Sequence, residues 1–468
     1  MALRSLSATS VVPRPFRARA STASADTGVT ANGADASDPK AASTLHIAYL
    51  CSLYPAVSHT FVLREVNALR ELGIAIDTFS IHRATSDQLL AQADRVAFAS
   101  TATILPPRWA ALLAAHARLA TRAPLVYIST LLTALGLASA GLRGRLWQVF
   151  YFAEAVMLWA ECQRRGIRHI HVHMGNVAAD AALLASEVGS RVEPSQPWSW
   201  SFTLHGPDEF FDVSRFRLAE KVRRARIVVC ISDFTRSQLM TLSDPELWHK
   251  LHVIHVGIPI EQFTRSRPEA RNHNDSTILC VGRLVPQKGQ AILLEAASLL
   301  AQRGRQVKLI LAGDGPTRPA LERLAERLGL ASQVHFAGAV GQEELHALYA
   351  GASIFCLASF AEGVPTVLME AMAMELPVIS TRITGVPELI DDGRNGLLVT
   401  PGRADQLADA LERLLCDPAF AGGLGEAARE TVLQEFNTKR SAEQLNLLFQ
   451  EQLTPRRARQ RRPEPTVL

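Results

Sequence analysis

Two carboxylates, Glu362 and Glu370, stand eight positions apart in the segment SFAEGVPTVLMEAMAMELPVIST. Pro365 is typical of a helix start and Pro377 lies beyond the expected helix end, so Glu370 should lie in a helix beside apolar neighbours. A buried carboxylate without a partner is costly or takes up a proton. A diol such as a ribose would supply two hydroxyl donors, and Glu362 would lie where backbone N–H groups face a ligand. The alternative is two surface glutamates that stabilise a helix dipole.

Two cations follow the strand predicted at TILCVGRL. Arg283 ends this stretch and Lys288 comes five residues later, in GRLVPQKG. Because the carboxyl ends of parallel strands meet at one edge, both should lie on the same rim as Glu362. A guanidinium binds phosphate oxygens in a bidentate manner and an ammonium acts as a point charge, so the pair suits a diphosphate. The alternative is a solvated turn. The next strand ends in AGDGP, a glycine turn that lets a ligand approach the backbone.

The elements that must position these residues follow from alternating patterns. From about residue 276, apolar runs without in–out alternation, such as VKLILAG and SIFCLAS, are separated by helical patterns. Such runs predict a parallel sheet covered on both faces. Residues 45–264 show the same arrangement less regularly. We therefore predict an α/β protein with two doubly wound, Rossmann-like domains that face each other across a cleft.

Length and composition set the organisation. A chain of 468 residues is too long for one ordinary core. A net charge of +4 gives no reason to expect a nucleic-acid partner, and six cysteines without a CxxC pair indicate reduced thiols and no zinc site. Residues 1–44 have the composition of a disordered leader or of an organellar transit peptide. The expected order is then a first domain (45–264), a linker (265–275), a second domain (276–436), a helix (437–453) and a basic disordered tail (454–468).

Residues 101–160 are unusual within the first domain. Between Arg122 and Arg143 lie twenty residues without a charge, which meets the length criterion for a membrane span. Strands of one sheet are expected on both sides, however, and a single span would place them in different compartments. We expect a helical apolar insert that is either buried or in contact with a membrane surface, with a span as the third alternative. The basic tail would also suit anionic lipid, although a solvated tail is an equal alternative.

The second-half motifs together resemble the nucleotide-sugar domain of retaining glycosyltransferases of family 4, which have the GT-B fold. GRLVPQKG, AGDGP, the opening segment and DDGRNGLLV occur in the family's order, and the match covers about residues 276–436. The resemblance implies that Arg283 and Lys288 bind the donor diphosphate, that Glu362 lies by the transferred sugar and that Glu370 holds the ribose hydroxyls. It also implies further donor-binding residues: Gly282, Gly313, Asp314, Val340, Gly363, Val364 and Thr366.

The first half resembles the family more loosely. YPAVSHTFVLREVNALRELG is similar to a subgroup that acts in exopolysaccharide or lipid-linked oligosaccharide (colanic-acid-type) assembly. SFTLHGPDEFF looks like the family's Thr-His-Gly segment, which would place His205 at the reaction centre with Asp208 nearby. CSLYPAVSHTF replaces a glycine-rich loop of many relatives, and Ser58 and Thr60 would supply acceptor-side donors at a helix start.

The HIHVHMGN segment raises a different question. His171 and His173 alternate in a predicted strand, but no carboxylate or cysteine follows at the spacing of metal ligands. We interpret both as strand residues, with His173 as an acceptor-side contact and no metal site.

The hypothesis is a retaining, metal-independent hexosyltransferase without a cofactor. It would move a hexose from a UDP- or GDP-sugar to a hydroxyl of a glycan or lipid-linked acceptor, in exopolysaccharide or cell-envelope glycan synthesis. Arg283 and Lys288 would stabilise the leaving diphosphate, with Glu362 and His205 as the other catalytic residues. The alternatives are a nucleotide-sugar epimerase with the GT-B fold and a non-catalytic nucleotide-sugar-binding scaffold. We expect a cytoplasmic protein at the inner face of the membrane, in peripheral contact through residues 101–160 and the tail.

Overall fold

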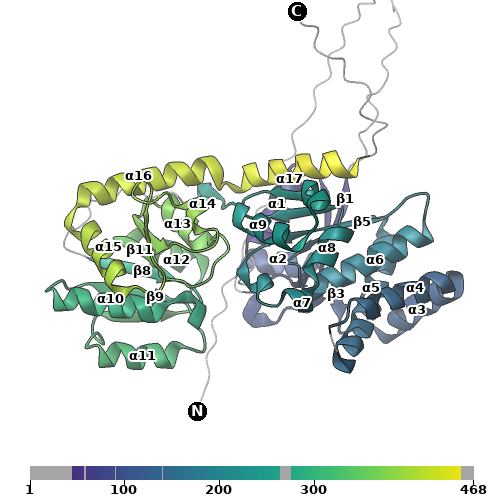
Figure 1. The fold of residues 1–468 in the computed structure, drawn as a ribbon, viewed down its shortest axis with the longest axis horizontal. Helices are drawn as coiled ribbons and strands as arrows, with labels where there is room; N and C mark the ends of the chain where they lie inside the picture. Colours follow the sequence, from purple (N-terminus) through teal and green to yellow (C-terminus); the bar gives the residue numbers. More distant parts are fainter. Residues whose placement is uncertain (1–44, 57–59, 90, 140, 264–275, 455–468) are drawn as a thin grey trace, which may run out of the picture. The chain divides into compact units, whose positions relative to one another are not determined.

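The computed structural model describes residues 45–56, 60–89, 91–139, 141–263 and 276–454. The strands in these ranges form two sheets, of seven and six strands, and the strand pairs within each sheet are parallel (Figure 1). Helices flank both sheets, so the predicted fold class, an α/β protein with two doubly wound sheets, is confirmed. The predicted leader (1–44), linker (265–275) and most of the tail (455–468) lie outside the described residues.

The first sheet has the strand order β3-β2-β1-β4-β5-β6-β7. Its strands are β1 (His46–Leu53), β2 (Ala75–His82), β3 (Ala102–Leu105), β4 (His169–His173), β5 (Ser199–Leu204), β6 (Ile227–Cys230) and β7 (Leu251–Val253). The order reverses between β1 and β4, and in open parallel sheets ligands bind outside the carboxyl ends of the strands at such a reversal.

The second sheet repeats this plan with the order β10-β9-β8-β11-β12-β13. Its strands are β8 (Thr277–Val281), β9 (Lys308–Ala312), β10 (Val334–Gly338), β11 (Ile354–Leu357), β12 (Val378–Thr381) and β13 (Leu397–Val399). Strands β8, β11 and β12 are buried along their whole length, as expected for strands covered on both faces. The reversal between β8 and β11 places the loops after these two strands beside each other.

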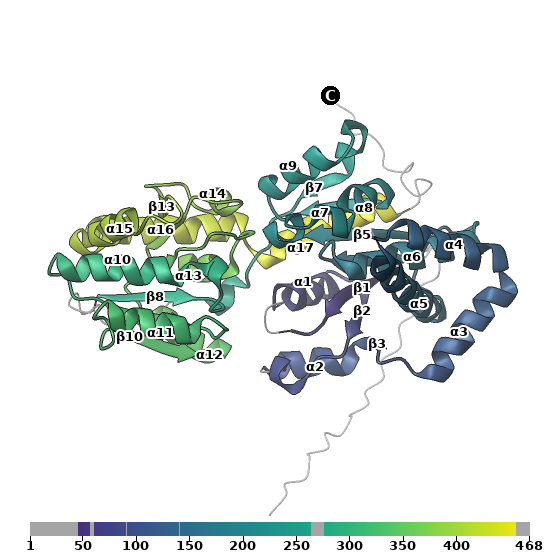
Figure 2. The same ribbon diagram turned by 60° about the horizontal axis from the view of Figure 1, so that its bottom comes forward.

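The helices around the first sheet build cores on its two faces. They are α1 (Thr60–Glu71), α2 (Gln92–Ser100), α3 (Trp109–Arg122), α4 (Pro124–Gly136), α5 (Leu142–Arg165), α6 (Val177–Val192), α7 (Val213–Phe216), α8 (Leu218–Arg224) and α9 (Asp233–Leu242). Short 3₁₀ segments cover Ser86–Gln88 (η2), Pro207–Phe210 (η3), Pro245–Lys250 (η4) and Ile260–Gln262 (η5). Helices α3 and α4 contact α5 and lie outside it in Figure 2.

The second sheet is covered by α10 (Gln290–Gln302), α11 (Arg318–Arg327), α12 (Gln342–Gly351), α13 (Thr366–Ala373), α14 (Val386–Leu389), α15 (Ala404–Cys416) and α16 (Pro418–Glu435), with the 3₁₀ segment η6 (Pro286–Lys288). The last helix, α17 (Thr438–Leu453), follows these in the chain but packs against α1. Its Leu445 and Phe449 belong to the core that β1 and α1 build. The C-terminal helix therefore completes the first domain.

The region 101–160 differs from the uniform helical insert that the sequence suggested. It begins with β3, the edge strand of the first sheet, and its last helix, α5, buries Phe152, Val156 and Trp159 in the domain core. Within this region, α3 and α4 are the additional helices, and they pack on the outer side of α5. In the described part of the chain no single helix is long and apolar enough to cross a membrane; α3 and α4 meet that test only as a pair, which bends by 115°.

Candidate active site

An ion pair lies at the carboxyl edge of the second sheet, on the loops that follow β8 and β11. Lys288, in η6, donates from Nζ to Glu362 Oε1 at 2.6 Å and to Oε2 at 2.8 Å. Ser359 Oγ also donates to Glu362 Oε1, at 2.6 Å, and the glutamate is 7% exposed. The structure thus brings together two residues that lie 74 positions apart in the sequence. Charge-assisted hydrogen bonds of this kind fix both side chains.

Arg283 lies on the same rim, directly after Gly282 at the end of β8. Its side chain is exposed and forms no ion pair with any residue that the structure describes. The aliphatic part of Lys288 passes over Gly282, since an added Cβ there would lie 3.8 Å from Lys288 Cδ. An unpaired guanidinium beside a fixed ammonium is an arrangement that suits a multivalent anion.

The AGDGP turn after β9 packs against this loop, backbone to backbone. Gly313 has φ +138°, and a Cβ on it would lie 2.0 Å from the carbonyl oxygen of Gly282. Only glycine fits such a position. Asp314 accepts a hydrogen bond from the N–H of Gly315 at 2.8 Å, so its carboxylate stabilises the turn.

The remaining predicted donor-side residues follow the neighbouring strands. Val340 lies two residues beyond β10, at a partly buried position. Gly363 and the buried Val364 follow Glu362, and Thr366 is the first residue of α13. All are therefore at the carboxyl edge of the sheet or at the helix start beside it.

Glu370 lies in α13 and is 3% exposed, as the apolar neighbours predicted. Both of its oxygens have protein partners: Arg64 Nη1 and Nη2 donate to Oε1, each at 3.1 Å, and Tyr349 OH donates to Oε2 at 3.0 Å. Burial raises the pKa of Glu370, although Arg64 and Tyr349 oppose this shift. The argument that this carboxylate lacks a protein partner is therefore wrong, because Arg64 of α1 supplies one. The assignment of Glu370 to ribose hydroxyls stays a prediction.

His205 follows β5 and is part of a chain of polar groups in which His173 and Tyr49 are buried and His205 and Glu65 are partly buried. His173 Nδ1 lies 2.8 Å from His205 Nε2, and His173 Nε2 lies 3.2 Å from Glu65 Oε1. Tyr49 OH donates to the same Glu65 oxygen at 2.9 Å. The ring of Phe61 lies 4.5 Å from the ring of His205, centroid to centroid. The Glu65–His173 pair thus fixes the orientation of the His205 ring.

A second carboxylate fixes the backbone of the His205 loop. Glu209 in η3 accepts hydrogen bonds from the N–H of His205 at 2.8 Å and of Gly206 at 3.4 Å. Burial raises the pKa of Glu209 to about 7, despite these hydrogen bonds. The loop contacts the Glu362 loop, because a Cβ on Gly363 would lie 2.1 Å from the His205 carbonyl oxygen. Strand-end loops of the two sheets therefore meet at His205 and Gly363.

The other acceptor-side predictions are less completely described. Thr60 is the first residue of α1 and is partly buried. Ser58 lies outside the described residues, as does the side chain of Asp208, whose backbone belongs to η3.

The strand β4 brings histidines close to a carboxylate that the sequence spacing did not reveal. Ligand atoms of Glu65, His171 and His173 lie within 4.8 Å of one another, a distance that suits a metal ion. His171 Nδ1 lies 2.7 Å from Ser201 Oγ and Nε2 lies 3.0 Å from Thr203 Oγ1, so both ring nitrogens already have hydroxyl partners. Burial lowers the pKa of His171 well below its usual range, which keeps the ring neutral. The absence of a metal site stays a prediction.

Four side chains that hydrogen-bond with or pair to the predicted site residues were missed from the sequence alone: Arg64, Glu65, Glu209 and Tyr349. Arg64 and Glu65 lie in the segment YPAVSHTFVLREVNALRELG and Glu209 in SFTLHGPDEFF, so each segment was recognised but these residues within it were not. Their partners are at least 16 residues away or are backbone groups of a loop, which no local pattern indicates.

Comparison with known proteins shows what the second domain is similar to. Residues 261–431 match the family model described as glycosyl transferases group 1. The chain is 28% identical to the alpha-D-kanosaminyltransferase of Streptomyces kanamyceticus over 333 residues, which cover 66% of this chain and 85% of that enzyme. It is 32% identical to the putative colanic acid biosynthesis glycosyltransferase WcaL of Salmonella typhimurium over 235 residues. That match covers 49% of this chain and only 57% of WcaL.

Solved structures agree on the fold. The UDP complex of Anabaena Alr3699/HepE superimposes with a TM-score of 0.66 at 19% identity, over 87% of this chain and 100% of the Anabaena chain. At this identity the likeness establishes the architecture, which is that of the GT-B glycosyltransferases.

Proposed function

We propose that this protein transfers a hexose from a nucleotide diphosphate sugar to a hydroxyl of a glycan or lipid-linked acceptor. The match of residues 261–431 to the glycosyl transferases group 1 model, within a GT-B fold, supports this. UDP is the first donor nucleotide to test, since the Anabaena neighbour was solved with UDP, and GDP is the second. The likeness to WcaL supports a role in exopolysaccharide synthesis.

The observation that carries the proposal is the Lys288–Glu362 ion pair beside the unpaired Arg283 at the strand reversal of the second sheet. A donor diphosphate would bind to Arg283 and Lys288. Negative charge grows on the diphosphate as its bond to the anomeric carbon breaks, and the two cations would stabilise that charge without a metal ion. Because Lys288 would then also contact the diphosphate, Glu362 would lose part of its contact with Lys288. Its carboxylate would accept hydrogen bonds from hydroxyls of the transferred sugar.

Glu370 would bind the ribose of the donor nucleotide. Two ribose hydroxyls can donate to a carboxylate, but here Arg64 already donates twice to Oε1. Nucleotide binding would therefore replace the Arg64 contacts, while Tyr349 keeps its hydrogen bond to Oε2.

His205 would lie beside the transferred sugar and the acceptor hydroxyl. Its loop contacts Gly363, the residue after Glu362, so groups of both sheets would line the reaction centre. No described carboxylate stands free at this position to act as a nucleophile, because Glu362 and Glu370 are both paired. We therefore infer that transfer proceeds without a covalent sugar–enzyme intermediate. Retention of the anomeric configuration is proposed from the resemblance to the retaining enzymes of family 4.

Peripheral contact with a membrane is part of this proposal, through the apolar faces of α3, α4 and α5. Leu125, Ile128 and Leu132 follow one face of α4 at helical spacing and are 81%, 55% and 62% exposed. Large apolar side chains are similarly exposed on the neighbouring helices at Trp109, Leu113, Leu142, Leu146 and Phe150. The sequence from residue 96 to 153 has five arginines and no acidic residue. An apolar face with basic neighbours suits an anionic lipid surface.

Two measurements test the proposed reaction. Calorimetric titration with UDP, GDP, ADP and their sugars should give heat with one donor class. Release of the nucleoside diphosphate with a candidate acceptor, followed by NMR of the anomeric proton of the product, should then show transfer with retention. Transfer should persist in excess EDTA. The proposal fails if no sugar nucleotide binds or if the product has the inverted configuration, and strict dependence on a divalent ion would remove the metal-free mechanism.

A further inference from the structure

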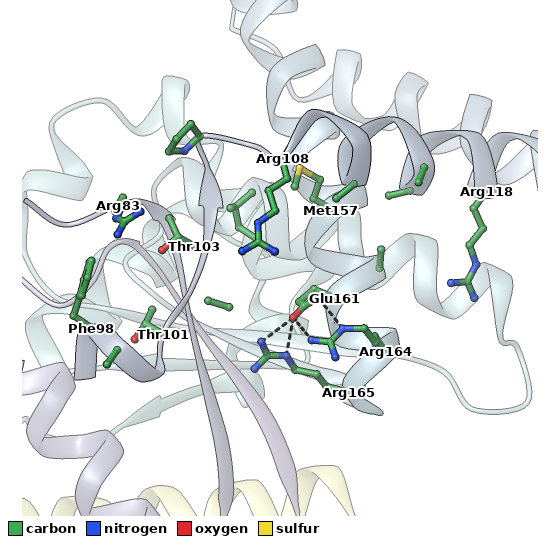
Figure 3. Close-up of a pocket in the computed structure, with 18 residues that line it drawn as sticks. Arg83, Phe98, Thr101, Thr103, Arg108, Arg118, Met157, Glu161, Arg164 and Arg165 are labelled. Carbon is green, nitrogen blue, oxygen red and sulfur yellow. Dashed lines mark hydrogen bonds and ion pairs between the residues drawn. The ribbon is translucent and has the colours of Figure 1, made fainter. Parts of the chain in front are cut away.

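A groove of about 860 Å³ runs along β3, the edge strand of the first sheet (Figure 3). Residues of α2, β3, α3 and α5 line it. Small side chains leave the space open, because six of the lining residues are alanines: Ala99, Ala102, Ala111, Ala114, Ala115 and Ala160. The groove is separate from the Lys288–Glu362 site, which belongs to the second sheet.

The groove is strongly basic. Five arginines line it, and Glu161 is its single acidic residue. Glu161 pairs with the two arginines that follow it on α5, at 2.6 and 2.7 Å. Arg83, Arg108 and Arg118 form no ion pair with any described residue, and Arg83 instead lies over the ring of Phe98, 5.4 Å from its centroid. Three guanidinium groups are therefore available to an anionic ligand.

These charges are spread along the groove. Arg108 precedes α3 and Arg118 lies ten positions further, which on a helix corresponds to about 15 Å. Arg83 directly follows β2, at the carboxyl edge of the sheet, whereas Arg164 and Arg165 end α5, close to the start of β4. The arginines thus extend from the carboxyl edge to the amino edge of the sheet. Such spacing suits a chain that carries several negative charges better than a single phosphate group.

The groove does not face the same way as the exposed apolar side of α3. Ala111, Ala114 and Arg118 follow one face of the helix at helical spacing and line the groove. Trp109 and Leu113, which are 71% and 66% exposed, lie on the opposite side of the helix. A bilayer that contacts the apolar side therefore would not fill the groove. The hydroxyl of Thr103, an exposed residue of β3, adds a hydrogen-bonding group that sugars can use.

We propose that the β3 groove binds an anionic oligosaccharide, with its carboxylate or phosphate groups on Arg83, Arg108 and Arg118. The inference rests on the proposed transferase function and names the substrate class: the acceptor or product glycan is acidic. The groove begins at the carboxyl edge of the first sheet, the edge on which His205 also lies. A glycan chain long enough to cross the strands between β5 and β3 would reach both the reaction centre and the groove.

Calorimetry with a galacturonate oligosaccharide and a neutral maltooligosaccharide of equal length tests the proposal on the full chain. The acidic probe should bind and the neutral one should bind at least tenfold more weakly. The variant R108Q/R118Q should lose about tenfold or more in affinity for the acidic probe, since charge-assisted contacts are lost. The matched control R122Q/R143Q removes two arginines of the same helical region outside the groove and should change affinity less than about twofold.

Equal loss in both variants, or equal binding of the two probes, overturns the proposal. So does a result in which R108Q/R118Q abolishes binding to phosphatidylglycerol vesicles but leaves galacturonate binding unchanged, because the groove would then be a lipid site. UDP and GDP titrations of the same variants separate the two proposals. If the unmodified protein binds neither UDP nor GDP, the transferase function is contradicted. The groove proposal depends only on the affinity for the galacturonate oligosaccharide.

Discussion

Arg64 and Glu370 lie 306 positions apart in the sequence, yet both terminal nitrogens of the arginine donate to the same carboxylate oxygen at 3.1 Å. The pair joins α1, beside the first sheet, to α13, beside the second. Both side chains are largely buried, with 12% and 5% exposure. In this conformation an arginine of the first domain occupies the carboxylate that we assign to the donor ribose.

This pair predicts opposite effects of two variants on nucleotide affinity. E370Q should weaken binding of the donor nucleoside diphosphate by about tenfold, because a charged acceptor is lost. R64M should strengthen it, because the nucleotide no longer competes with the guanidinium. Each single variant should also lower the free energy of unfolding by about 3 kcal/mol, as removal of one partner of a buried pair does. Calorimetry and urea unfolding check these values.

The double variant R64M/E370Q is the control for the pair. It should cost less stability than the sum of the single variants, since neither charge remains buried alone. If R64M weakens nucleotide binding as much as E370Q does, Arg64 belongs to the donor site and does not compete with it.

The cations on the rim predict a loss of turnover without a loss of the fold. R283A and K288A should each lower kcat by about a hundredfold or more. Each variant removes a positioned cation that would stabilise the negative charge on the departing diphosphate. Arg283 is exposed, so R283A should unfold at the temperature of the unmodified protein. The matched control is R394A, at an arginine of the same domain whose side chain is 82% exposed. Near-normal turnover by both R283A and K288A would overturn the site assignment.

The chain Glu65–His173–His205 predicts graded effects on transfer. H205A should lower kcat most, and E65Q should lower it less, because Glu65 only orients His205 through His173. Neither variant should change donor affinity by more than about threefold, since neither side chain is assigned to the donor diphosphate or ribose. E65D, which keeps the charge, should recover part of the rate lost in E65Q. An E65Q variant that reacts at the normal rate would show that His205 needs no such support.

Two buried carboxyl groups predict that part of the stability is lost as the pH rises. Burial raises the pKa of Glu154 from 4.5 to about 7, with the charge of Asp180 as the smaller cause, and burial likewise raises the pKa of Glu209 to about 7. Between these pKa values the folded chain keeps a proton that the unfolded chain releases. Each group's contribution to the free energy of unfolding is therefore fully present below about pH 4.5 and is lost as the pH rises to about 7. The shift corresponds to about 3 kcal/mol for each group.

The variant E154Q isolates this effect, because its amide does not titrate. The free energy of unfolding of E154Q, relative to that of the unmodified protein, should rise by about 2.5 kcal/mol between pH 5 and pH 8. Urea unfolding at both pH values gives that difference, in which the opposite contribution of the neutral His169 and His171 cancels. A pH-independent difference would mean that Glu154 is ionised throughout this range.

The exposed face of α4 predicts binding to anionic vesicles. L125Q/L132Q should reduce the affinity for phosphatidylglycerol vesicles, measured by sedimentation, by about two to three orders of magnitude, since about 2 kcal/mol of apolar burial is lost with each leucine. The control L447Q removes a leucine of α17 that is 67% exposed, away from this face, and should have no effect. Binding that survives in L125Q/L132Q but disappears at high salt would show that charge alone attracts the protein to the surface.

The sequence by itself determined the two parallel sheets and the chemistry at the ends of their strands. Apolar runs without alternation define strands buried on both faces, and carboxyl ends of such strands necessarily share one edge, which is why Lys288 and Glu362 could be placed together. The sequence did not reveal β3, a four-residue edge strand too short to show a pattern. The C-terminal helix was recognised from the sequence, but the sequence did not reveal that this helix packs on the first domain.

Tertiary structure decided which charged groups meet. Burial alone requires that Glu370 have a partner, but a ribose and Arg64 satisfy that requirement equally well, and only the packing of α1 beside α13 selects the arginine. In the same way, Glu65 reaches His173 because α1 and β4 lie together, although more than a hundred residues separate them. Periodicity is local and survives in the sequence, whereas pairing between distant side chains depends on the packing of whole elements.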